Sequence, residues 1–197
     1  VDLFTMNGLD ALKETIDHVD ILVNNFGKPA SSSWDSIDNW ALEWEQNVLL
    51  GVKVTQLLVD GMKAKEWGRV IFVGTVGVDR PRNHSPGYYG AKASLHAIVR
   101  TLAMDLRGTG VTANMFNPGM IATAEVKEML TNAAGRRSLS TDWESVESWA
   151  STEYFPNLTS RIATPEDIGR VVSFLASEQA WYINGASIAV DGGSVDA

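Results

Sequence analysis

The chain alternates short apolar runs with longer segments in which apolar residues recur every three or four positions. The short runs have the length and the Val and Ile content of buried strands. They are 20–24, 69–74, 111–116 and 187–190. The longer segments, which show helical periodicity, are 37–65, 87–107 and 165–177. Strands that alternate with helices predict an α/β fold, in which a parallel sheet is covered on both faces.

Turns that contain Asn, Gly or Pro follow three of the predicted strands. Residues 24–27 (N-N-F-G) follow the first, 74–75 (G-T) the second and 117–119 (N-P-G) the third. The carboxyl ends of parallel strands meet at one edge of a sheet, and ligands bind beyond that edge. The three turns therefore predict a site there.

Tyr88 and Lys92 stand at the start of the long helix 87–107, close to these turns. They are four residues apart and so share one helix face. A tyrosine ordinarily ionises near pH ~10, and a cation held close to it favours the phenolate. We therefore expect Lys92 to lower the pKa of Tyr88 toward the range of a useful proton donor. The alternative is a surface Tyr beside a solvated Lys, because such short motifs recur by chance.

Composition narrows the classes of function. The length of 197 residues suits a single domain, here 1–197. A net charge of −8 without a basic patch argues against binding to nucleic acid or to an anionic membrane. The chain has no Cys and three scattered His, which predicts no disulfides and no metal site. No apolar run is long enough to span a bilayer, so we expect a cytoplasmic protein.

Several segments occur in a characteristic order and spacing. They are the turn 24–27, Asn47 in its helix, Thr75 placed 13 residues before Tyr88, 118–123 (P-G-M-I-A-T), 164–169 (T-P-E-D-I-G) and 183–193. Together they resemble the short-chain dehydrogenase/reductase (SDR) family, and within it the 3-oxoacyl-(acyl carrier protein) reductase branch. The resemblance covers almost the whole chain and implies a Rossmann-like, doubly wound parallel sheet.

The resemblance implies an enzyme that uses NAD or NADP and transfers hydride to or from a carbonyl or alcohol carbon of a small molecule. Its implied catalytic residues are Thr75, Tyr88, Lys92 and Asn47. Tyr88 would donate a proton to the substrate oxygen, and Thr75 would hydrogen-bond the same oxygen. Asn47 would hold a water that connects Lys92 to solvent. Alternatively, Asn47 satisfies a backbone group in a helix kink, and both roles are compatible.

The residues implied to bind the cofactor are Asp2, Asn24, Gly27, Tyr88, Lys92, Pro118, Gly119, Ile121 and Thr123. Asp2 would contact the adenine, and Asn24 would brace its strand end beside the adenosine ribose. Lys92 would bind the nicotinamide ribose. Ile121 and Thr123 would bind the carboxamide and the diphosphate.

The chain departs from the family pattern at its beginning. The family starts with a strand and a glycine-rich turn that cradles the diphosphate at a helix N-terminus. Here residues 1–3 instead look like the end of the family's third strand, so the first two strand–helix units, about sixty residues, are expected to be absent. Strand 21–23 would then be an exposed sheet edge that a partner subunit or rearranged N-terminal residues cover. A short gene product and an incomplete longer chain both fit. If the chain is really this short, its affinity for the dinucleotide is expected to be weak, because the diphosphate loses its helix N-terminus.

The segment 124–160 corresponds to the substrate lid of the family and is rich in aromatic residues. These aromatics either line a large apolar pocket or fill a core or subunit contact. The helices that carry Asn47 and Tyr88 usually pair between subunits in the family, which implies a homodimer or homotetramer. The alternative function is a cofactor-poor or inactive module that keeps the scaffold for binding or assembly.

Overall fold

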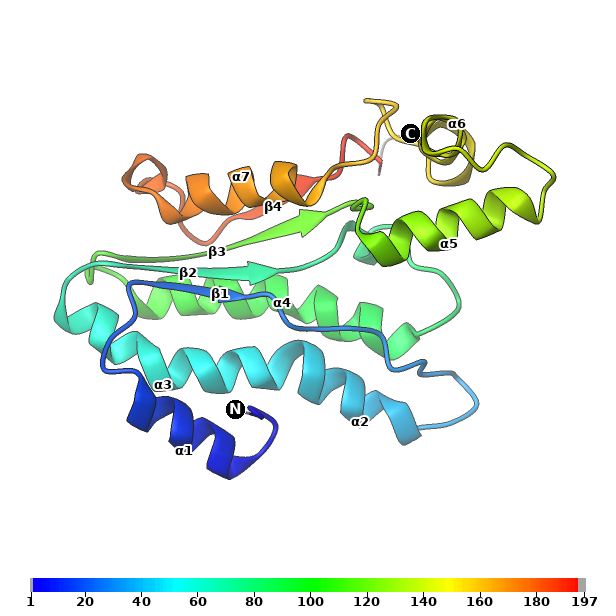
Figure 1. Ribbon diagram of the computed structural model, residues 1–197. Helices are drawn as coiled ribbons and strands as arrows, with labels where there is room; N and C mark the ends of the chain where they lie inside the picture. Colours follow the sequence, from blue (N-terminus) through cyan, green and yellow to red (C-terminus); the bar gives the residue numbers. More distant parts are fainter. Residues whose placement is uncertain (1, 195–197) are drawn as a thin grey trace.

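The sheet has four parallel strands in the order β1-β2-β3-β4 (Figure 1). The computed structural model describes residues 2–194. The strands are β1 (Ile21–Asn24), β2 (Gly68–Val73), β3 (Val111–Pro118) and β4 (Ser187–Val190). Every residue of β3 is buried, as expected for a strand covered on both faces. The predicted α/β fold and its four strands are confirmed.

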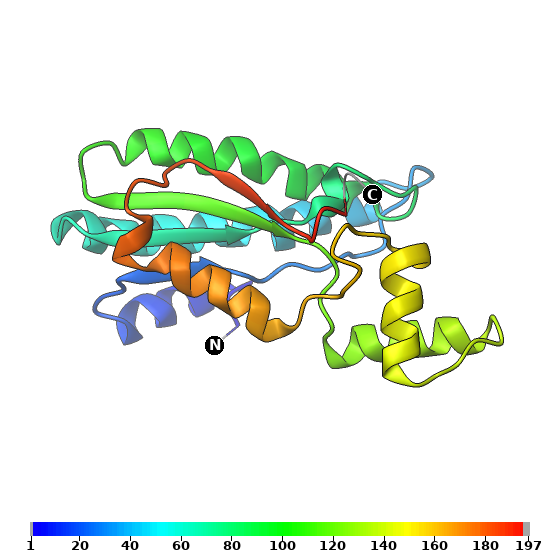
Figure 2. The same ribbon diagram turned by 90° about the horizontal axis from the view of Figure 1, so that it is seen from above.

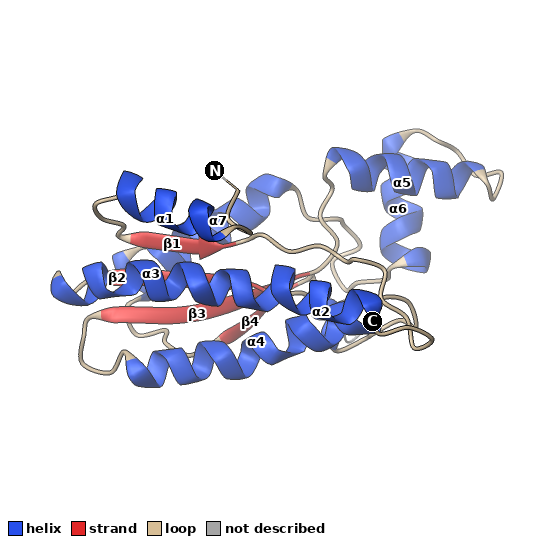
Figure 3. Cartoon of the chain, turned by 90° about the horizontal axis from the view of Figure 1, so that it is seen from below, coloured by secondary structure: helices blue, strands red, loops and turns tan. Residues whose placement is uncertain are grey.

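Helices cover both faces of this sheet. Those on one face are α1 (Met6–Thr15), α2 (Asp38–Trp44), α3 (Leu50–Ala64) and α4 (Pro86–Asp105), as Figure 3 shows. The opposite face carries α7 (Pro165–Ala176). Successive residues of β2 point to opposite faces. Phe72 accordingly packs with Leu95 of α4, whereas Ile71 packs with Leu175 of α7.

The helix predicted over 37–65 is interrupted. Helices α2 and α3 are joined by one π-helical turn, Glu45–Leu49, so the chain continues with a local bulge. Asn47 lies within this bulge and is buried. Such bulges are rare and often occur at functional sites. The apolar periodicity of the sequence could not show it.

Beyond the carboxyl ends of the strands lie α5 (Ala124–Gly135) and α6 (Trp143–Trp149) (Figure 2). A further π-helical turn, Ala150–Tyr154, continues α6. This segment has a small core of its own, which contains Leu130, Val146 and the partly buried Trp149. Much of the segment 124–160 is thus helical, and part of its aromatic content fills this core, which is one of the two alternatives predicted for these residues.

The N-terminal residues differ from the expectation. Leu3 and Phe4 form a turn, in which the Asp2 carboxylate accepts the Phe4 backbone N–H at 3.0 Å. Residues 2–3 therefore do not end a strand, in contrast to the prediction. Val1 lies outside the described residues. In the part of the chain that the structure describes, β1 pairs with β2 alone, and Ile21 is 44% exposed. This matches the predicted sheet edge. The absence of the family's first two strand–helix units stays a prediction.

None of the helices within residues 2–194 is long and apolar enough to cross a membrane. No group of three or more His, Asp or Glu side chains in the same residues is arranged to hold a metal ion.

Candidate active site

A cavity of about 950 Å³ opens at the carboxyl ends of β2, β3 and β4. Thr75 lines it just after β2, and Pro118 and Gly119 line it at the end of β3. Tyr88 enters it from the first turn of α4. The structure thus brings together the tyrosine and two of the three turns predicted for this edge of the sheet. Residues 24–27 and Lys92 are not among the residues that line the cavity.

Local structure fixes the two hydroxyl groups. Pro86 starts α4 at a position where its missing N–H is harmless, so Tyr88 lies in the first helical turn. Thr75 caps the short 3₁₀ turn Val76–Val78, because its Oγ1 accepts the Gly77 backbone N–H at 3.1 Å. The Thr75 hydroxyl also hydrogen-bonds the Tyr88 side chain. A substrate oxygen in the cavity would meet both hydroxyls.

The pKa of Tyr88 is raised, so the expectation that Lys92 lowers it is wrong for this structure. Burial is the largest cause, and the charges of Tyr89 and Glu43 act in the same direction. The hydrogen bond with Thr75 opposes the rise. Tyr88 therefore holds its proton firmly and is a donor rather than a base near neutral pH.

Lys92 points into a different environment from the one expected. It is 3% exposed, and its Nζ donates to the carbonyl oxygen of Val73 at 2.9 Å. Burial lowers the pKa of Lys92 to about 8. An ammonium has three N–H donors, and this is its one protein hydrogen bond among the described residues. The remaining donors have no hydrogen-bond partner in the described part of the chain.

Gly27 marks the place where Lys92 and Asn47 meet. A Cβ at Gly27 would lie 2.5 Å from Asn47 Oδ1 and 2.8 Å from Lys92 Nζ. No real side chain fits at those distances, so only glycine allows both groups to approach the turn after β1. The sequence prediction that Gly27, Asn47 and Lys92 share one site agrees with this geometry.

Asn47 fills the structural role that the sequence offered as an alternative. Its Nδ2 donates to the carbonyl oxygens of Glu43 at 2.9 Å and Lys28 at 3.1 Å, which satisfies backbone groups at the π-helical bulge. Its Oδ1 is buried and has no hydrogen-bond partner in the described part of the chain. A buried acceptor of this kind ordinarily binds water or a ligand. The proton-relay role stays a prediction.

Glu43 is the residue that the sequence analysis missed. Its carboxylate is fully buried and accepts hydrogen bonds from the Ala30 N–H at 2.7 Å, Ser32 Oγ at 3.4 Å and Asn47 Nδ2 at 3.2 Å. Ser32 Oγ in turn accepts the N–H of Gly87, the residue before Tyr88, at 2.9 Å. Glu43 thus links the loop after β1 to the start of α4. The available signal was its position four residues before Asn47, on the same helix face.

The other expected cofactor residues are placed as follows. Asn24 Nδ2 donates to Thr55 Oγ1 at 3.0 Å and so braces the end of β1, as predicted. Ile121 forms a bridge with Ala163, and Thr123 caps α5 through its contact with the Val126 N–H at 3.3 Å. Asp2 is not among the residues that line the cavity. Its expected contact with adenine stays a prediction.

A nicotinamide cofactor fits what these residues offer. Gly119 packs so tightly on the chain after β4 that a Cβ there would lie 2.9 Å from Asp191 Cα, which keeps the backbone flat beside the cavity. Lys92 has unused donors, and Asn47 has an unused acceptor. These are the groups that ribose hydroxyls require.

Comparison with known proteins decides the family. A family model described as enoyl-(acyl carrier protein) reductase matches residues 5–195. The chain belongs to the short-chain dehydrogenase/reductase family. It is 34% identical over 197 residues to the uncharacterized oxidoreductase YvaG of Bacillus subtilis, covering 98% of this chain and 74% of that protein. It is 32% identical over 185 residues to the 3-oxoacyl-(acyl carrier protein) reductase MabA of Mycobacterium tuberculosis, covering 93% of this chain and 68% of that protein.

Solved SDR structures agree. The L-sorbose reductase of Gluconobacter frateurii, complexed with NADPH and L-sorbose, matches with a TM-score of 0.87 and 29% identity. The match covers 100% of this SDR chain and 76% of that one. The predicted class, an NAD- or NADP-dependent SDR oxidoreductase, is thereby confirmed. The alternative of an inactive binding module is not favoured.

Proposed function

We propose that this SDR reduces the carbonyl group of a small molecule, with Tyr88 as the proton donor. The observation that carries the proposal is the shared cavity, in which the hydrogen-bonded Tyr88 and Thr75 side chains stand beside Pro118 and Gly119. Bound NAD(P)H supplies the hydride. As negative charge develops on the substrate oxygen, Tyr88 donates its proton and Thr75 hydrogen-bonds the same oxygen.

The pKa of Tyr88 decides which direction of the reaction finds this group in the protonation state that it needs. Reduction needs the neutral phenol, and alcohol oxidation needs the phenolate. Because burial, Tyr89 and Glu43 raise this pKa, the neutral form dominates across the physiological range. A phenol remains a far stronger acid than the alcohol that is formed, so proton transfer to the product is downhill. We infer that Tyr88 is in the form that reduction requires near neutral pH.

We assign the remaining predicted residues to support of this step. Lys92 would hold the nicotinamide ribose with its free donors, and a water on Asn47 Oδ1 would return a proton through Lys92 to the site. Pro118, Gly119, Ile121 and Thr123 would hold the nicotinamide end and the diphosphate. The cofactor's adenosine end would lie near Asp2, Asn24 and Gly27.

Three broader features belong to the same proposal. The segment 124–160 would serve as the substrate lid, which is supported by Tyr154 and Phe155 on the cavity wall. A homodimer or homotetramer formed through the helices of Asn47 and Tyr88 is expected from the family. The expected cytoplasmic location belongs to this proposal as well.

The test compares Tyr88→Phe with Tyr89→Phe. The two tyrosines are adjacent, and both line the cavity, but only Tyr88 bonds Thr75. Reduction of acetoacetyl-CoA, a neutral 3-oxo ester and L-sorbose would be followed with NADH and NADPH. We expect Tyr88→Phe to lower kcat by about 10²–10⁴-fold, the usual range for loss of a general acid, and Tyr89→Phe to retain most activity. Full activity in Tyr88→Phe, or no reduction of any carbonyl by the unmodified protein, would overturn the proposal.

A further inference from the structure

The substrate side of the cavity is unusually basic for this protein. The whole chain carries 24 acidic and 16 basic residues. The cavity wall nevertheless includes three arginines, Arg80, Arg82 and Arg161, with only two carboxylates, Asp167 and Asp191. A basic lining in an acidic protein raises the local concentration of anions.

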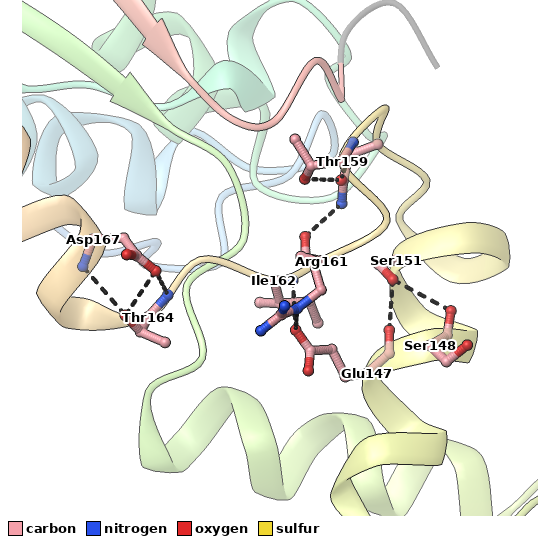
Figure 4. A network of polar contacts seen from close by, with 9 residues as sticks. Glu147, Ser148, Ser151, Thr159, Arg161, Ile162, Thr164 and Asp167 are labelled. Atoms are coloured by element: carbon pink, nitrogen blue, oxygen red, sulfur yellow. Dashed lines mark hydrogen bonds and ion pairs between the residues drawn. The ribbon is translucent and has the colours of Figure 1, made fainter.

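Most of these charges already have partners. Arg161 Nε forms an ion pair with Glu147 at 3.1 Å, and Asp167 pairs with Arg170 at 2.7 Å. The Asp167 carboxylate also accepts the Thr164 backbone N–H at 2.9 Å. Figure 4 shows this contact and the ion pair between Arg161 and Glu147. These groups stabilise the walls of the cavity.

Two more of these charged side chains, Asp191 and Arg80, bind the turn that follows β4. The Asp191 carboxylate accepts the Gly193 N–H at 3.0 Å and the Ser194 hydroxyl at 2.8 Å. Arg80 donates to the carbonyl oxygen of Ser194. Both residues are thus engaged in holding the chain after β4.

Arg82 differs from them. Its guanidinium carbon lies 4.2 Å from the centre of the Phe155 ring, and no carboxylate among residues 2–194 forms an ion pair with it. Stacking on a ring face leaves the N–H groups around the edge of the guanidinium available. Arg82 is therefore a positioned cation with unused donors on the wall of the Tyr88 cavity.

The Phe155 ring under Arg82 is itself held in place by its neighbours. The Phe155 ring meets the edge of Tyr154 with centroids 4.7 Å apart, and Tyr154 stacks on Trp149 at 4.9 Å. The Phe155 backbone N–H donates to the carbonyl oxygen of Ala150 at 2.7 Å. A cation fixed before the ligand arrives loses less entropy on binding than a mobile one.

We propose that Arg82 on Phe155 forms a subsite for a negatively charged group of the substrate, so that the protein's substrates are anionic carbonyl compounds. The inference rests on the proposed function, because it assigns the far end of the molecule whose carbonyl Tyr88 protonates. A guanidinium presents paired N–H donors that match a carboxylate or a phosphate. The anion is either a carboxylate on the keto compound itself or a phosphate on a thioester carrier.

The experiment uses matched pairs of charged and neutral substrates. For the carboxylate arm, acetoacetate, 4-oxopentanoate and 5-oxohexanoate are each compared with their methyl ester. This series also varies the distance from the carbonyl to the charge. For the phosphate arm, acetoacetyl-CoA is compared with the neutral N-acetylcysteamine thioester of the same acyl group. The quantity measured is the ratio of kcat/KM for the charged and neutral members of each pair.

The variants are Arg82→Gln and, as a matched control, Arg107→Gln. Arg107 follows the other end of α4 and is exposed, so its loss removes the same charge away from the cavity. We expect Arg82→Gln to lower the charged-to-neutral ratio by roughly 10- to 100-fold in one arm, the value of a charge-assisted hydrogen bond. Arg107→Gln should leave the ratio unchanged, and added salt should reduce it in the unmodified protein. The arm that responds identifies the anion.

The outcomes separate this inference from the proposed function. If Arg82→Gln reduces the neutral members at the unmodified rate but has a lowered charged-to-neutral ratio, both the anion subsite and the reductase proposal are supported. Equal ratios in the unmodified protein and Arg82→Gln, in both arms, would overturn the anion subsite and leave the reductase proposal standing. If no compound is reduced, titration calorimetry of the same pairs decides the subsite. Binding of the acids or of the CoA thioester that Arg82→Gln loses supports it, and identical binding by both proteins refutes it.

Discussion

The inner and outer walls of the cavity differ in how deeply their polar groups are buried and how many hydrogen bonds hold them. The inner wall, at Thr75 and Tyr88, is backed by Glu43, Asn47 and Lys92, which do not line the cavity themselves. These three residues are at most 4% exposed and are connected by hydrogen bonds to the loop after β1 and to β2, and through Ser32 to the start of α4. The outer wall presents Arg82, which is exposed and contacts Phe155 through one face. Buried polar groups are costly when a partner is lost, whereas exposed ones tolerate change.

This difference separates the reaction from the choice of substrate. Groups that must be held accurately for proton transfer lie where the sheet and two helices constrain them. Groups that would recognise the rest of the substrate lie on a loop and on the segment 124–160. We therefore expect substitutions on the inner wall to affect kcat and folding, and those on the outer wall to affect discrimination between substrates.

Lys92→Met should give the largest effect. We expect kcat/KM to fall by about 10²-fold or more, because the ammonium is lost from the site. Stability at pH 7 should stay the same or rise. The folded protein holds the Lys92 proton less tightly than the unfolded chain, since burial lowers its pKa from 10.5 to about 8. The resulting penalty, roughly 3 kcal/mol at pH 7, disappears as the pH rises from about 8 toward 10.5.

Thermal unfolding between pH 6 and 10.5 measures this directly. The stability advantage of Lys92→Met should shrink over the upper part of the range. Lys13→Met, on the exposed surface of α1, is the control and should show no such trend. A marked loss of stability in Lys92→Met at pH 7 would contradict the account.

Glu43→Ala should destabilise the protein by about 2–4 kcal/mol. The substitution leaves donors of Ala30, Ser32 and Asn47 without their acceptor in a buried site. Urea unfolding gives the value, and Glu43→Gln should recover part of it. Glu45→Ala is the matched control, because Glu45 pairs with Lys53 at the surface and such pairs contribute about 0–1 kcal/mol. Similar losses for both variants would mean that the Glu43 network does not stabilise the site.

Gly27→Ala should have a smaller effect, about 1–3 kcal/mol of strain and roughly a tenfold fall in kcat/KM. The new methyl group would push on Asn47 Oδ1 and Lys92 Nζ. Gly90→Ala is the control, because a Cβ at Gly90 meets nothing within 4 Å and alanine favours the helix. Unchanged kinetics in Gly27→Ala would show that these two groups need not meet at this turn.

Phe155→Leu should have the smallest effect of the series. It keeps an apolar side chain but removes the aromatic face under Arg82, an interaction of about 0.5–1 kcal/mol, which corresponds to a loss of a few-fold in the preference for charged substrates. Steady-state kinetics with the matched pairs measures it. Phe174→Leu, on the exposed face of α7, should change nothing.

The sequence predicted the fold well because its signals are local and repeated. Each of the four strands was an apolar run, and the helix predicted over 165–177 is α7, which the structure begins at Pro165 with a full capping box. The placement of Thr75, Tyr88, Pro118 and Gly119 on one cavity followed from the rule for the ends of parallel strands. These features depend on neighbours in the chain and on topology alone.

The remaining features depend on tertiary burial. The π-helical bulge at Asn47 leaves the apolar periodicity intact, so the segment 37–65 looked like one regular helix. Glu43 resembles a surface glutamate until the loop after β1 closes over it. The pKa of Tyr88 was predicted in the wrong direction, since the spacing to Lys92 is local but the desolvation that outweighs it arises only in the folded protein.

The central claim is that the buried inner wall keeps Tyr88 protonated and ready to donate. It is tested most directly by an NMR titration of the tyrosine ring carbons, with Tyr88→Phe to identify the signal among four tyrosines. We predict that Tyr88 titrates above the ordinary value near ~10, and that Glu43→Gln moves its titration to lower pH because a negative charge is removed. A Tyr88 signal that titrates below 10 in the unmodified protein, or that ignores the loss of the Glu43 charge, would contradict this account.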